Sequence, residues 1–441
     1  MRKLTVMATN NSNRRRVVVI GGGFAGLNFV KHLDADKFDV TLVDEHNYHS
    51  FPPLFYQVAS AGLEPSSICF PLRRELRKRH GHRINFCMGR VRTIDVSRRC
   101  VHTRRDTLPY DILVIAAGTT SNFFGLKELD KHVYTIKSTS EALRCRNDIL
   151  LRLERASQTH DAALRRRLLD FVVIGGGPTG VEIAGALGEM KRYILPREYP
   201  SIDPSEVNIV LVEGTQRLLG AMSEKSSADA LKYLRQLMVD VRLGMTVKGY
   251  DGELVELGDG GTLVASTVIW TAGVTACGFD FDGEFDRDNV IGHGGRFLTD
   301  VHCRVTGLPG EVYALGDIAL MSGDPAFPKG HPQLAQPALQ MGRLLARNLN
   351  DGGVREFRYK DKGSMATVGR NRAVVDLKHG HFSGFPAWMV WMFIHLVSIL
   401  GMRNRLTVLI NWIWAYFNYS TSMRMLIKPS TVSYTHLTLP T

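Results

Sequence analysis

The sequence has few cysteines and no Cys-x-x-C pair. Enzymes that pass electrons from a flavin to a redox-active disulfide need two cysteines close together, so this class is disfavoured. No cysteine stands in a metal-binding spacing with histidine, and we expect no metal site. The scatter indicates reduced thiols in a reducing compartment. The six cysteines are Cys69, Cys87, Cys100, Cys145, Cys277 and Cys303.

The chain also lacks an acidic excess, an apolar signal segment and any recognisable nucleic-acid-binding motif. Residues 1–16 are polar and end in three arginines, which predicts a disordered lead-in; a short presequence of the mitochondrial type is the alternative. The formal net charge is +12 over 441 residues, and such an excess favours an anionic partner. Because nucleic-acid motifs are missing, we expect an anionic lipid surface and no nucleic acid.

Two near-copies of one glycine-rich turn are the most informative feature that is present. Residues 17–20 and 171–174 are apolar, strand-like runs, and each leads into G-x-G-x-x-G. In this pattern the glycines allow a tight turn, close approach of a pyrophosphate and close helix packing, while the helix N-terminus faces the phosphates. Two copies predict two bound dinucleotides, typically a flavin and a nicotinamide. The predicted cofactor-binding glycines are Gly21, Gly23 and Gly26, and Gly175, Gly177 and Gly180.

Each half repeats the same further elements. A second strand ends in an acid, Asp44 or Glu213, which is expected to bind the adenosine ribose. Glu213 would repel a 2′-phosphate and favours NADH over NADPH, although Arg217 lies nearby. A closing strand then ends in Ala-Gly, which adds Gly118 and Gly273 to the predicted cofactor-binding residues. This self-similarity indicates two Rossmann-like domains of common design.

A third strand pattern, 312–317, delivers Asp317 into a turn after the second unit. The first unit is therefore predicted to be interrupted by the second, in an α/β fold with two nested Rossmann-like dinucleotide-binding domains. The expected FAD-binding domain is 17–121 with 290–380, and the expected NADH-binding domain is 164–277. A connecting helix is expected over 142–167 and a surface loop over 191–205.

The C-terminal part, 384–428, is apolar and aromatic with arginines between two stretches. The first stretch is near the ~18-residue threshold for a spanning helix, but it contains His395 and Pro386. Tryptophan and tyrosine favour the headgroup boundary. We therefore predict amphipathic helices anchored at a membrane surface; a spanning helix and a dimer-burying pair are the alternatives. The last residues, 433–441, resemble a non-native tail and are left out of the fold.

Several segments resemble the type II NADH:quinone oxidoreductases, a family of single-chain flavoproteins that do not pump protons. The resemblance runs from Arg16 to about Lys428. It is most specific at Ala335–Gln340, which resembles the family's A-Q-x-A-x-Q quinone motif, and it also covers 43–59, 362–370, 387–388, 395–396 and 401–405. In a helix, Gln336 and Gln340 share one face, so that their amides could bind a quinone carbonyl.

The resemblance assigns three further roles. Glu182 would lie near the contact between flavin and nicotinamide, although a carboxylate in the first turn of a helix is also favoured by the helix dipole alone. Asp317 would bind the ribityl or pyrophosphate part of FAD, or cap the following helix. The family often has a lysine before its Ser/Thr-Gly-Phe; here His381 takes that place and Lys378 is close by.

The resemblance implies an enzyme that oxidises NADH by hydride transfer to FAD and then reduces a membrane quinone. Glu182, Gln336 and Gln340 are the predicted catalytic residues. A homodimer and a position on the cytoplasmic face of the inner membrane are also expected. Two alternatives stay open: a soluble FAD-dependent NADH reductase that serves a protein acceptor, and a redox-inactive nucleotide sensor or scaffold. Sulfide:quinone oxidoreductases are relatives that use reactive cysteines, and the cysteine scatter disfavours that activity.

Overall fold

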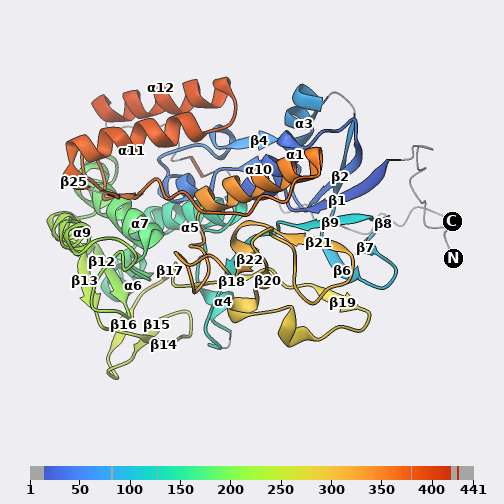
Figure 1. Ribbon diagram of the computed structural model, residues 1–441. Helices are drawn as coiled ribbons and strands as arrows, with labels where there is room; N and C mark the ends of the chain where they lie inside the picture. Colours follow the sequence, from blue (N-terminus) through green and yellow to red (C-terminus); the bar gives the residue numbers. More distant parts are fainter. Residues whose placement is uncertain (1–13, 81–82, 127, 379, 419–424, 427–441) are drawn as a thin grey trace, which may run out of the picture.

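The computed structural model describes residues 14–80, 83–126, 128–378, 380–418 and 425–426. It contains two parallel α/β units and a layer of two C-terminal helices above them (Figure 1). This confirms the predicted α/β class with two Rossmann-like units. The predicted lead-in (apart from 14–16), the predicted non-native tail and the basic residues Arg424 and Lys428 lie outside the described residues.

The first sheet is parallel and five-stranded. All four residues of its strand β9 are fully buried, as expected for a parallel strand covered on both faces. The last strand, β21, comes from far along the chain and adds to β9 at the sheet edge, so the chain returns to the first unit after completing the second. In spatial order the strands are β21 (Glu311–Ala314), β9 (Ile112–Ile115), β1 (Arg15–Ile20), β2 (Phe38–Asp44) and β5 (Ile84–Met88).

The second sheet is parallel and four-stranded. Its strands in spatial order are β13 (Asp240–Leu243), β12 (Asn208–Glu213), β11 (Asp170–Ile174) and β17 (Thr267–Trp270). The chain leaves the first unit along β10 (Thr119–Ser121) and comes back along β18 (Val274–Ala276). These two strands pair antiparallel, so the two connections between the units are hydrogen-bonded to each other.

Two expectations for the connecting segments need correction. The helix expected over 142–167 is two helices, α5 (Thr139–Gln158) and α6 (Ala162–Leu169). Ser138 and Glu141 form a capping box that starts α5, and Asp161 caps α6. The surface loop expected over 191–205 begins as helix, because α7 (Pro178–Glu189) continues through a π-helical turn, Met190–Ile194, into α8 (Leu195–Glu198).

The C-terminal helices are α11 (Phe385–Ser398) and α12 (Met402–Asn418). Their inner faces contribute Ala387, Trp391 and Val408 to the same hydrophobic cluster as α7. The three-stranded sheet β23 (Ser364–Thr367), β24 (Ala373–Leu377) and β25 (Gly380–Gly384) lies beneath α11. It packs against α7 and α9 (Glu224–Gln236), two helices of the second unit. Within the described ranges, no helix combines the length and apolar character needed to cross a bilayer.

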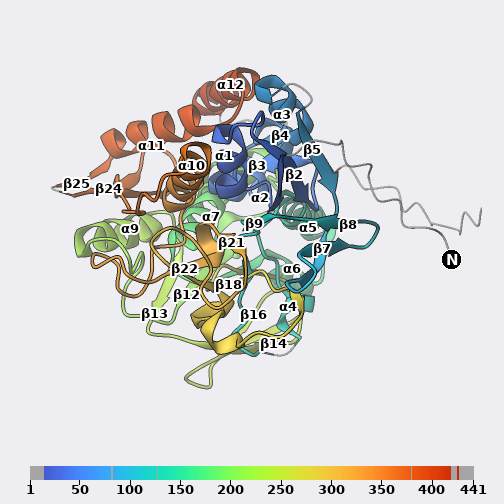
Figure 2. The same cartoon turned by 45° about the vertical axis from the view of Figure 1, so that its right-hand side comes forward.

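The contact between α1 (Phe24–His32) and α10 (Ala335–Asp351) fixes the face of the first unit that lies nearest the C-terminal layer (Figures 1 and 2). A Cβ atom added at Gly342 would lie 2.5 Å from the carbonyl oxygen of Ala25 and 3.0 Å from the amide nitrogen of Phe29. Both neighbours are backbone atoms, so neither can rotate away. The two helices approach this closely at residue 342 because glycine has no side chain.

We expect Gly342→Ala to push α10 away from α1 and to lower the free energy of unfolding by ~1–3 kcal/mol, the usual cost of overpacking a core. Urea denaturation would measure this. Arg343→Ala is the matched control, because Arg343 is exposed on the same helix and should change stability by less than ~0.5 kcal/mol. Equal stability of the two variants would contradict the close packing.

Candidate functional site

The two glycine-rich turns have matching geometry. Gly21 and Gly175 end their strands at φ of 101° and 109°, values that favour glycine. At the third glycine of each turn, Gly26 and Gly180, an added Cβ would strike the carbonyl oxygen of the first glycine. The remaining glycines, Gly23 and Gly177, are the N-caps of α1 and α7 and have open space where a Cβ would be. Each turn thus presents an uncovered helix N-terminus, the arrangement that binds pyrophosphate.

The two predicted ribose-binding acids are also placed alike. Asp44 Oδ2 accepts a hydrogen bond from the amide of Gly22 at 2.6 Å, and its Oδ1 accepts one from His46 at 2.7 Å. Glu213 does the same with Gly176 at 2.5 Å and Thr215 at 2.7 Å. Each carboxylate therefore lies at the mouth of its glycine turn and retains acceptor capacity.

Arg217, the residue that weakened the sequence argument for NADH, donates a hydrogen bond to the carbonyl of Gly220 at 2.6 Å. Gly118 and Gly273 have φ of 70° and 78° and lead directly into the paired strands β10 and β18. All the predicted cofactor-binding glycines therefore lie at turns after strands of the two parallel sheets.

Asp317 lies in a short 3₁₀ turn, Gly316–Ile318, directly after β21. Burial raises the pKa of its carboxyl, and the cations Lys137 and Arg296 oppose that shift. Burial in turn lowers the pKa of Lys137. The Asp317 carboxylate makes no hydrogen bond to any described residue, and α10 starts too far along the chain for it to be an N-cap. Asp317 is therefore a half-buried carboxylate that accepts no hydrogen bond from a described residue, and it lies at the same edge of the first sheet as the first glycine-rich turn. Such a carboxylate is suited to accept hydrogen bonds from the hydroxyl groups of a ribityl chain.

A cavity of about 170 Å³ lies between α7, β23 and the C-terminal helices. Its inner end is formed by Glu182, Thr367 and Tyr56, and its outer part by residues of α11 and α12. The stacked rings of Trp388 and Tyr416, with centroids 5.8 Å apart, belong to this outer part. The remaining lining residues are Gln57, Ser60, Ala61, Gly62, Ala186, Glu189, Tyr193, Ile194, Gly369, Arg370, Trp391, Met392, Trp412 and Ala415.

Glu182 is 8% exposed, and it accepts a long hydrogen bond, 3.5 Å, from the amide of Thr367. Burial raises its pKa to about 8, so the carboxyl is largely protonated at neutral pH. Trp391 is fully buried beside the same cavity. Its Nε1 makes no hydrogen bond of good geometry to a described residue, but it lies near enough to the Glu182 carboxyl to oppose the rise of that group's pKa. A ligand carbonyl in the cavity could accept a better hydrogen bond from this N–H group.

Further along α7, Glu189 accepts a hydrogen bond from the amide of Arg370 at 2.5 Å, and burial raises its pKa. The Arg370 guanidinium donates to the carbonyls of Ala415 and Tyr416, 2.5 and 2.8 Å away on α12. On the opposite wall, Trp412 Nε1 donates to Gln57 Oε1 at 2.9 Å. Polar contacts thus fix α12 on both sides of the cavity.

Gln336 and Gln340 share one face of α10, as expected, but they are not among the residues that line this cavity. Gln336 Nε2 donates to the carbonyl of Gly363 at 3.0 Å, and its Oε1 accepts from the amide of Lys362 at 3.2 Å. Gln340 is bonded in the same way to the amide and carbonyl of Lys360, both at 3.0 Å. Both amides therefore hold the chain segment that precedes β23.

His381 also lies away from the cavity. Its Nε2 is 3.2 Å from Asp229 Oδ2, and its Nδ1 is 3.1 Å from Asp376 Oδ1 and 3.0 Å from Ser226 Oγ. His381, which takes the place of the family's lysine, therefore connects β25 to α9.

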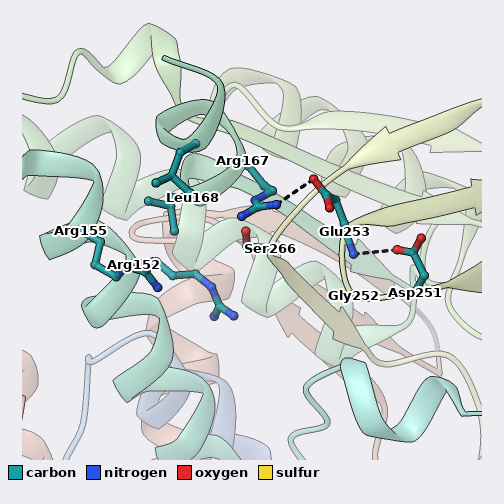
Figure 3. A pocket seen from close by; sticks show the side chains of 9 residues that line it. Arg152, Arg155, Arg167, Leu168, Asp251, Gly252, Glu253 and Ser266 are labelled. Carbon is teal, nitrogen blue, oxygen red and sulfur yellow. Dashed lines mark hydrogen bonds and ion pairs between the residues drawn. The ribbon is translucent and has the colours of Figure 1, made fainter. Parts of the chain in front are cut away.

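A second pocket, of about 390 Å³, lies between α5, α6 and the hairpin β14 (Val247–Tyr250) and β15 (Leu254–Leu257). Figure 3 shows arginines of the two helices facing this hairpin, and Arg167 is bonded to Glu253 at 2.8 Å. Ser266, just before β17, belongs to its lining. The pocket is therefore at the edge where strands of the second sheet begin, opposite the edge where Gly175 lies.

Sequence reasoning missed several residues of the cavity. Tyr56 and Gln57 lie in a segment that carried the family resemblance but received no role, and Trp391 was counted only among membrane-facing aromatics. Trp391 could have been singled out because it is one helical turn from His395, whose ring stacks on it at 4.1 Å. Burial lowers the pKa of His395 to about 4, so this histidine is neutral within the apolar helix.

Comparisons with known proteins agree with this geometry. Residues 15–342 match the pyridine nucleotide-disulphide oxidoreductase family, and residues 362–421 match the NDH2 C-terminal domain. A type II NADH:quinone oxidoreductase of Mycobacterium tuberculosis, Ndh, is 33% identical over 89% of this chain and 86% of its own length. The chain belongs to the type II NADH:quinone oxidoreductases. This confirms the resemblance, and with it the assignment as a flavoprotein oxidoreductase of NADH and quinone.

Other relatives show how far the fold extends. NdhA of M. tuberculosis is 34% identical over 89% of this chain and 85% of its own length. The structure of NDH2 from Plasmodium falciparum in complex with NADH superposes with a TM-score of 0.85 at 21% identity, over 94% of this chain and 100% of that chain. A sulfide:quinone oxidoreductase of Aquifex aeolicus has the same fold (TM-score 0.68, 18% identity, 92% of this chain and 96% of that chain). All six cysteines of the present chain are free thiols.

The raised pKa of Glu182 makes stability depend on pH. Between pH 4.5, the ordinary value, and about 8, the folded state keeps a proton that the unfolded chain releases. The free energy of unfolding contributed by this group therefore falls as pH rises through this window, by at most ~1.4 kcal/mol per unit. We expect Glu182→Gln to lose that slope in urea denaturation from pH 5 to 8.

The control for this measurement is Glu224→Gln, because Glu224 is an exposed carboxyl at the start of α9. It should keep the pH slope of the unmodified protein. Parallel pH dependence of the unmodified protein and Glu182→Gln would show that Glu182 does not hold its proton.

Proposed function

We propose that this chain uses the cavity between α7 and the C-terminal helices as its quinone site, with Glu182 as the proton-holding group. The observation that supports this is the position of one buried carboxyl, with a pKa of about 8, at the inner end of a cavity whose outer part is made by apolar helices. Reduction of a quinone consumes two protons as well as two electrons. A carboxyl that is protonated at neutral pH is suited to supply one of them.

FAD is assigned to the first unit. The uncovered N-terminus of α1 after Gly21–Gly26 fits the pyrophosphate, Asp44 fits the adenosine ribose, and Asp317 fits the ribityl hydroxyls. Lys137 adds a cation near Asp317. Bound FAD would supply the chemistry of hydride acceptance from NADH and two-electron transfer to quinone. Asp44, Asp317 and the turn at Gly21–Gly26 would hold it in place.

NADH is assigned to the second unit, on the turn Gly175–Gly180. Glu213 would bind the ribose hydroxyls and repel the 2′-phosphate of NADPH. Arg217 donates one hydrogen bond to the carbonyl of Gly220, but its guanidinium keeps its charge and further donors. The preference for NADH therefore rests on Glu213, and Arg217 acts against it.

Gln336 and Gln340 are proposed to position the quinone site. A direct hydrogen bond from either amide to a quinone carbonyl would require it to leave its backbone partners in 360–363. Held as they are, the two amides fix the start of β23, which ends at Thr367 beside Glu182.

The outer face of α11 and α12 is proposed to bind an anionic membrane surface. Large apolar side chains on this face are strongly exposed, while Arg403 at the start of α12 offers a cation to lipid headgroups. Figures 1 and 2 show both helices on one side of the molecule. The most exposed are Phe393, Met402, Ile410, Trp414 and Phe417, between 62% and 74%. Quinone would then enter from the lipid side, past the stacked rings of Trp388 and Tyr416.

The cytoplasmic face of the inner membrane and a homodimer remain part of this proposal. The first rival, a soluble reductase, predicts that removal of residues after Gly384 leaves solubility intact. That outcome conflicts with the burial of Ala387, Trp391 and Val408 in the core cluster. The second rival, a nucleotide sensor, predicts that NADH does not bleach the flavin spectrum.

The cavity can be tested by separating the two half-reactions. Ala186 lines the cavity on α7, and Ala186→Phe should fill much of it. We expect NADH to bleach the flavin as in the unmodified protein, whereas reoxidation by a short-chain quinone should slow about tenfold or more, as for the loss of ~1.4 kcal/mol of binding. Stopped-flow absorbance in detergent would follow both steps.

Ala228→Leu is the control, since Ala228 is an exposed alanine on α9. It should leave both half-reactions unchanged. If quinone reoxidises the flavin of Ala186→Phe at the unmodified rate, this cavity is not the quinone site. If NADH reduces the flavin of the unmodified protein but quinone cannot reoxidise it, quinone is not the electron acceptor.

Membrane binding is tested with vesicles that contain anionic phospholipid. Burial of a large apolar side chain contributes about 1.5–3 kcal/mol, so we expect Phe393→Ser with Trp414→Ser to weaken co-flotation about tenfold or more. Met88→Ser is the control, because Met88 is 61% exposed on β5, outside this face. If the double variant floats as well as the control, α11 and α12 do not form the docking face.

A further inference from the structure

A cluster of three metal-binding side chains lies outside the site described above. Asp95 on β6 (Val91–Asp95) and Cys100 and His102 on β7 (Cys100–Thr103) each offer one ligand atom, and these atoms lie within 4.8 Å of one another. Asp95 and Cys100 are buried, at 6% and 7% exposure. The strands lie on the side of the molecule away from α11 in both views (Figures 1 and 2).

The strand register explains why the three side chains meet. Asp95 is directly opposite Cys100 in the antiparallel pair β6–β7. His102 follows Cys100 by two residues, and residues two apart on a strand share a face. From the sequence we expected no metal site, but on a strand the Cys-x-His spacing places a thiol and an imidazole side by side.

The ligand atoms lie at nearly the spacing that a small cation needs. Cys100 Sγ and His102 Nε2 are 3.3 Å apart, about 0.3 Å less than the ~3.6 Å that follows when sulfur at ~2.3 Å and nitrogen at ~2.0–2.1 Å bind one zinc ion at a tetrahedral angle. A small outward rotation of either side chain would make up this difference. His102 Nδ1 is 3.0 Å from Oγ1 of Thr107, the residue opposite His102 on β8 (Thr107–Pro109). Such an outer contact fixes the ring so that Nε2 faces the metal.

One oxygen of the Asp95 carboxylate accepts no hydrogen bond from a described residue, so it can bind the cation. Asp95 Oδ1 accepts from the amide of Arg98 at 2.8 Å, which orients the group. Its Oδ2 is 3.9 Å from Arg98 Nε, and the Arg98 side chain is 85% exposed, so it can move into solvent. Asp282 on β19 (Asp280–Asp282) pairs with Asp95 and adds further negative charge.

We propose that Asp95, Cys100 and His102 form a binding site for a borderline-soft divalent cation, with zinc as the preferred ion. Thiolate, imidazole and carboxylate together select zinc over magnesium or calcium. Three protein ligands leave the fourth position to water. The ion connects β6 and β7, and Thr107 links the site to β8, so its role is to stabilise this sheet. Since Cys100 must lose its proton to bind, zinc affinity should rise with pH.

The test uses the full chain with its flavin. After incubation with zinc and desalting, we expect elemental analysis to find one ion per chain in the unmodified protein and none in Cys100→Ser or His102→Ala. Cys87→Ser is the matched control: Cys87 is also buried, 3.5 Å from the carboxylate of Asp106, and this variant should retain zinc. Zinc should also raise the thermal midpoint of the unmodified protein and not of His102→Ala.

Two further measurements guard against variants that fail to fold. Thr107→Val keeps all three ligands and should weaken zinc binding by about tenfold. When cobalt replaces zinc, the unmodified protein should show a charge-transfer band from the thiolate to the metal. Thr107→Val should show the same band, but only at a higher cobalt concentration. The proposal is wrong if the unmodified protein retains no zinc, if Cys100→Ser and His102→Ala retain as much as Cys87→Ser, or if cobalt shows no thiolate band.

Discussion

The structure depends on helix α7, because this one helix joins the second glycine-rich turn to the inner end of the cavity. Its N-cap is Gly177, in that turn, and Glu182 follows five residues later. At 1.5 Å per residue these points are about 7.5 Å apart along the helix. Close packing of Gly180 against Gly175 fixes where the helix starts. A shift of that turn would therefore move the buried carboxyl as well.

The C-terminal helices have two faces with different tasks. The inner face buries Trp391 and Val408 with α7, whereas the outer face leaves Phe393 and Trp414 more than 60% exposed. Because the cavity lies between α7 and these helices, removing them would remove one of its walls. The proposed membrane anchor is thus also part of the proposed quinone site, which explains why its aromatic residues are spread around both helices.

Much of the fold could be predicted because glycine turns and buried parallel strands leave strong local patterns. The two turns, their acids and the return of β21 to the first sheet all follow from such patterns. The continuation of α7 to Glu198 could not, since Lys191–Arg197 is rich in charge and contains proline, and its helix is held by tertiary packing of Leu195. The contacts of His381 with Ser226 and Asp229, and the cavity wall at Tyr56, were also beyond reach, because they join residues more than a hundred positions apart.

The glutamine pair shows how a motif can be recognised while its physical role stays open. The helical spacing correctly places Gln336 and Gln340 on one face, but spacing does not say what that face meets. In the structure it meets backbone groups of 360–363, which have no sheet partner of their own there. From Gly363 the chain enters β23, and four residues of strand, about 13 Å, bring it to Thr367. The amide of Thr367 donates a long hydrogen bond to Glu182, so in the proposed site the two glutamines would act on the Glu182 carboxyl through the strand that they anchor.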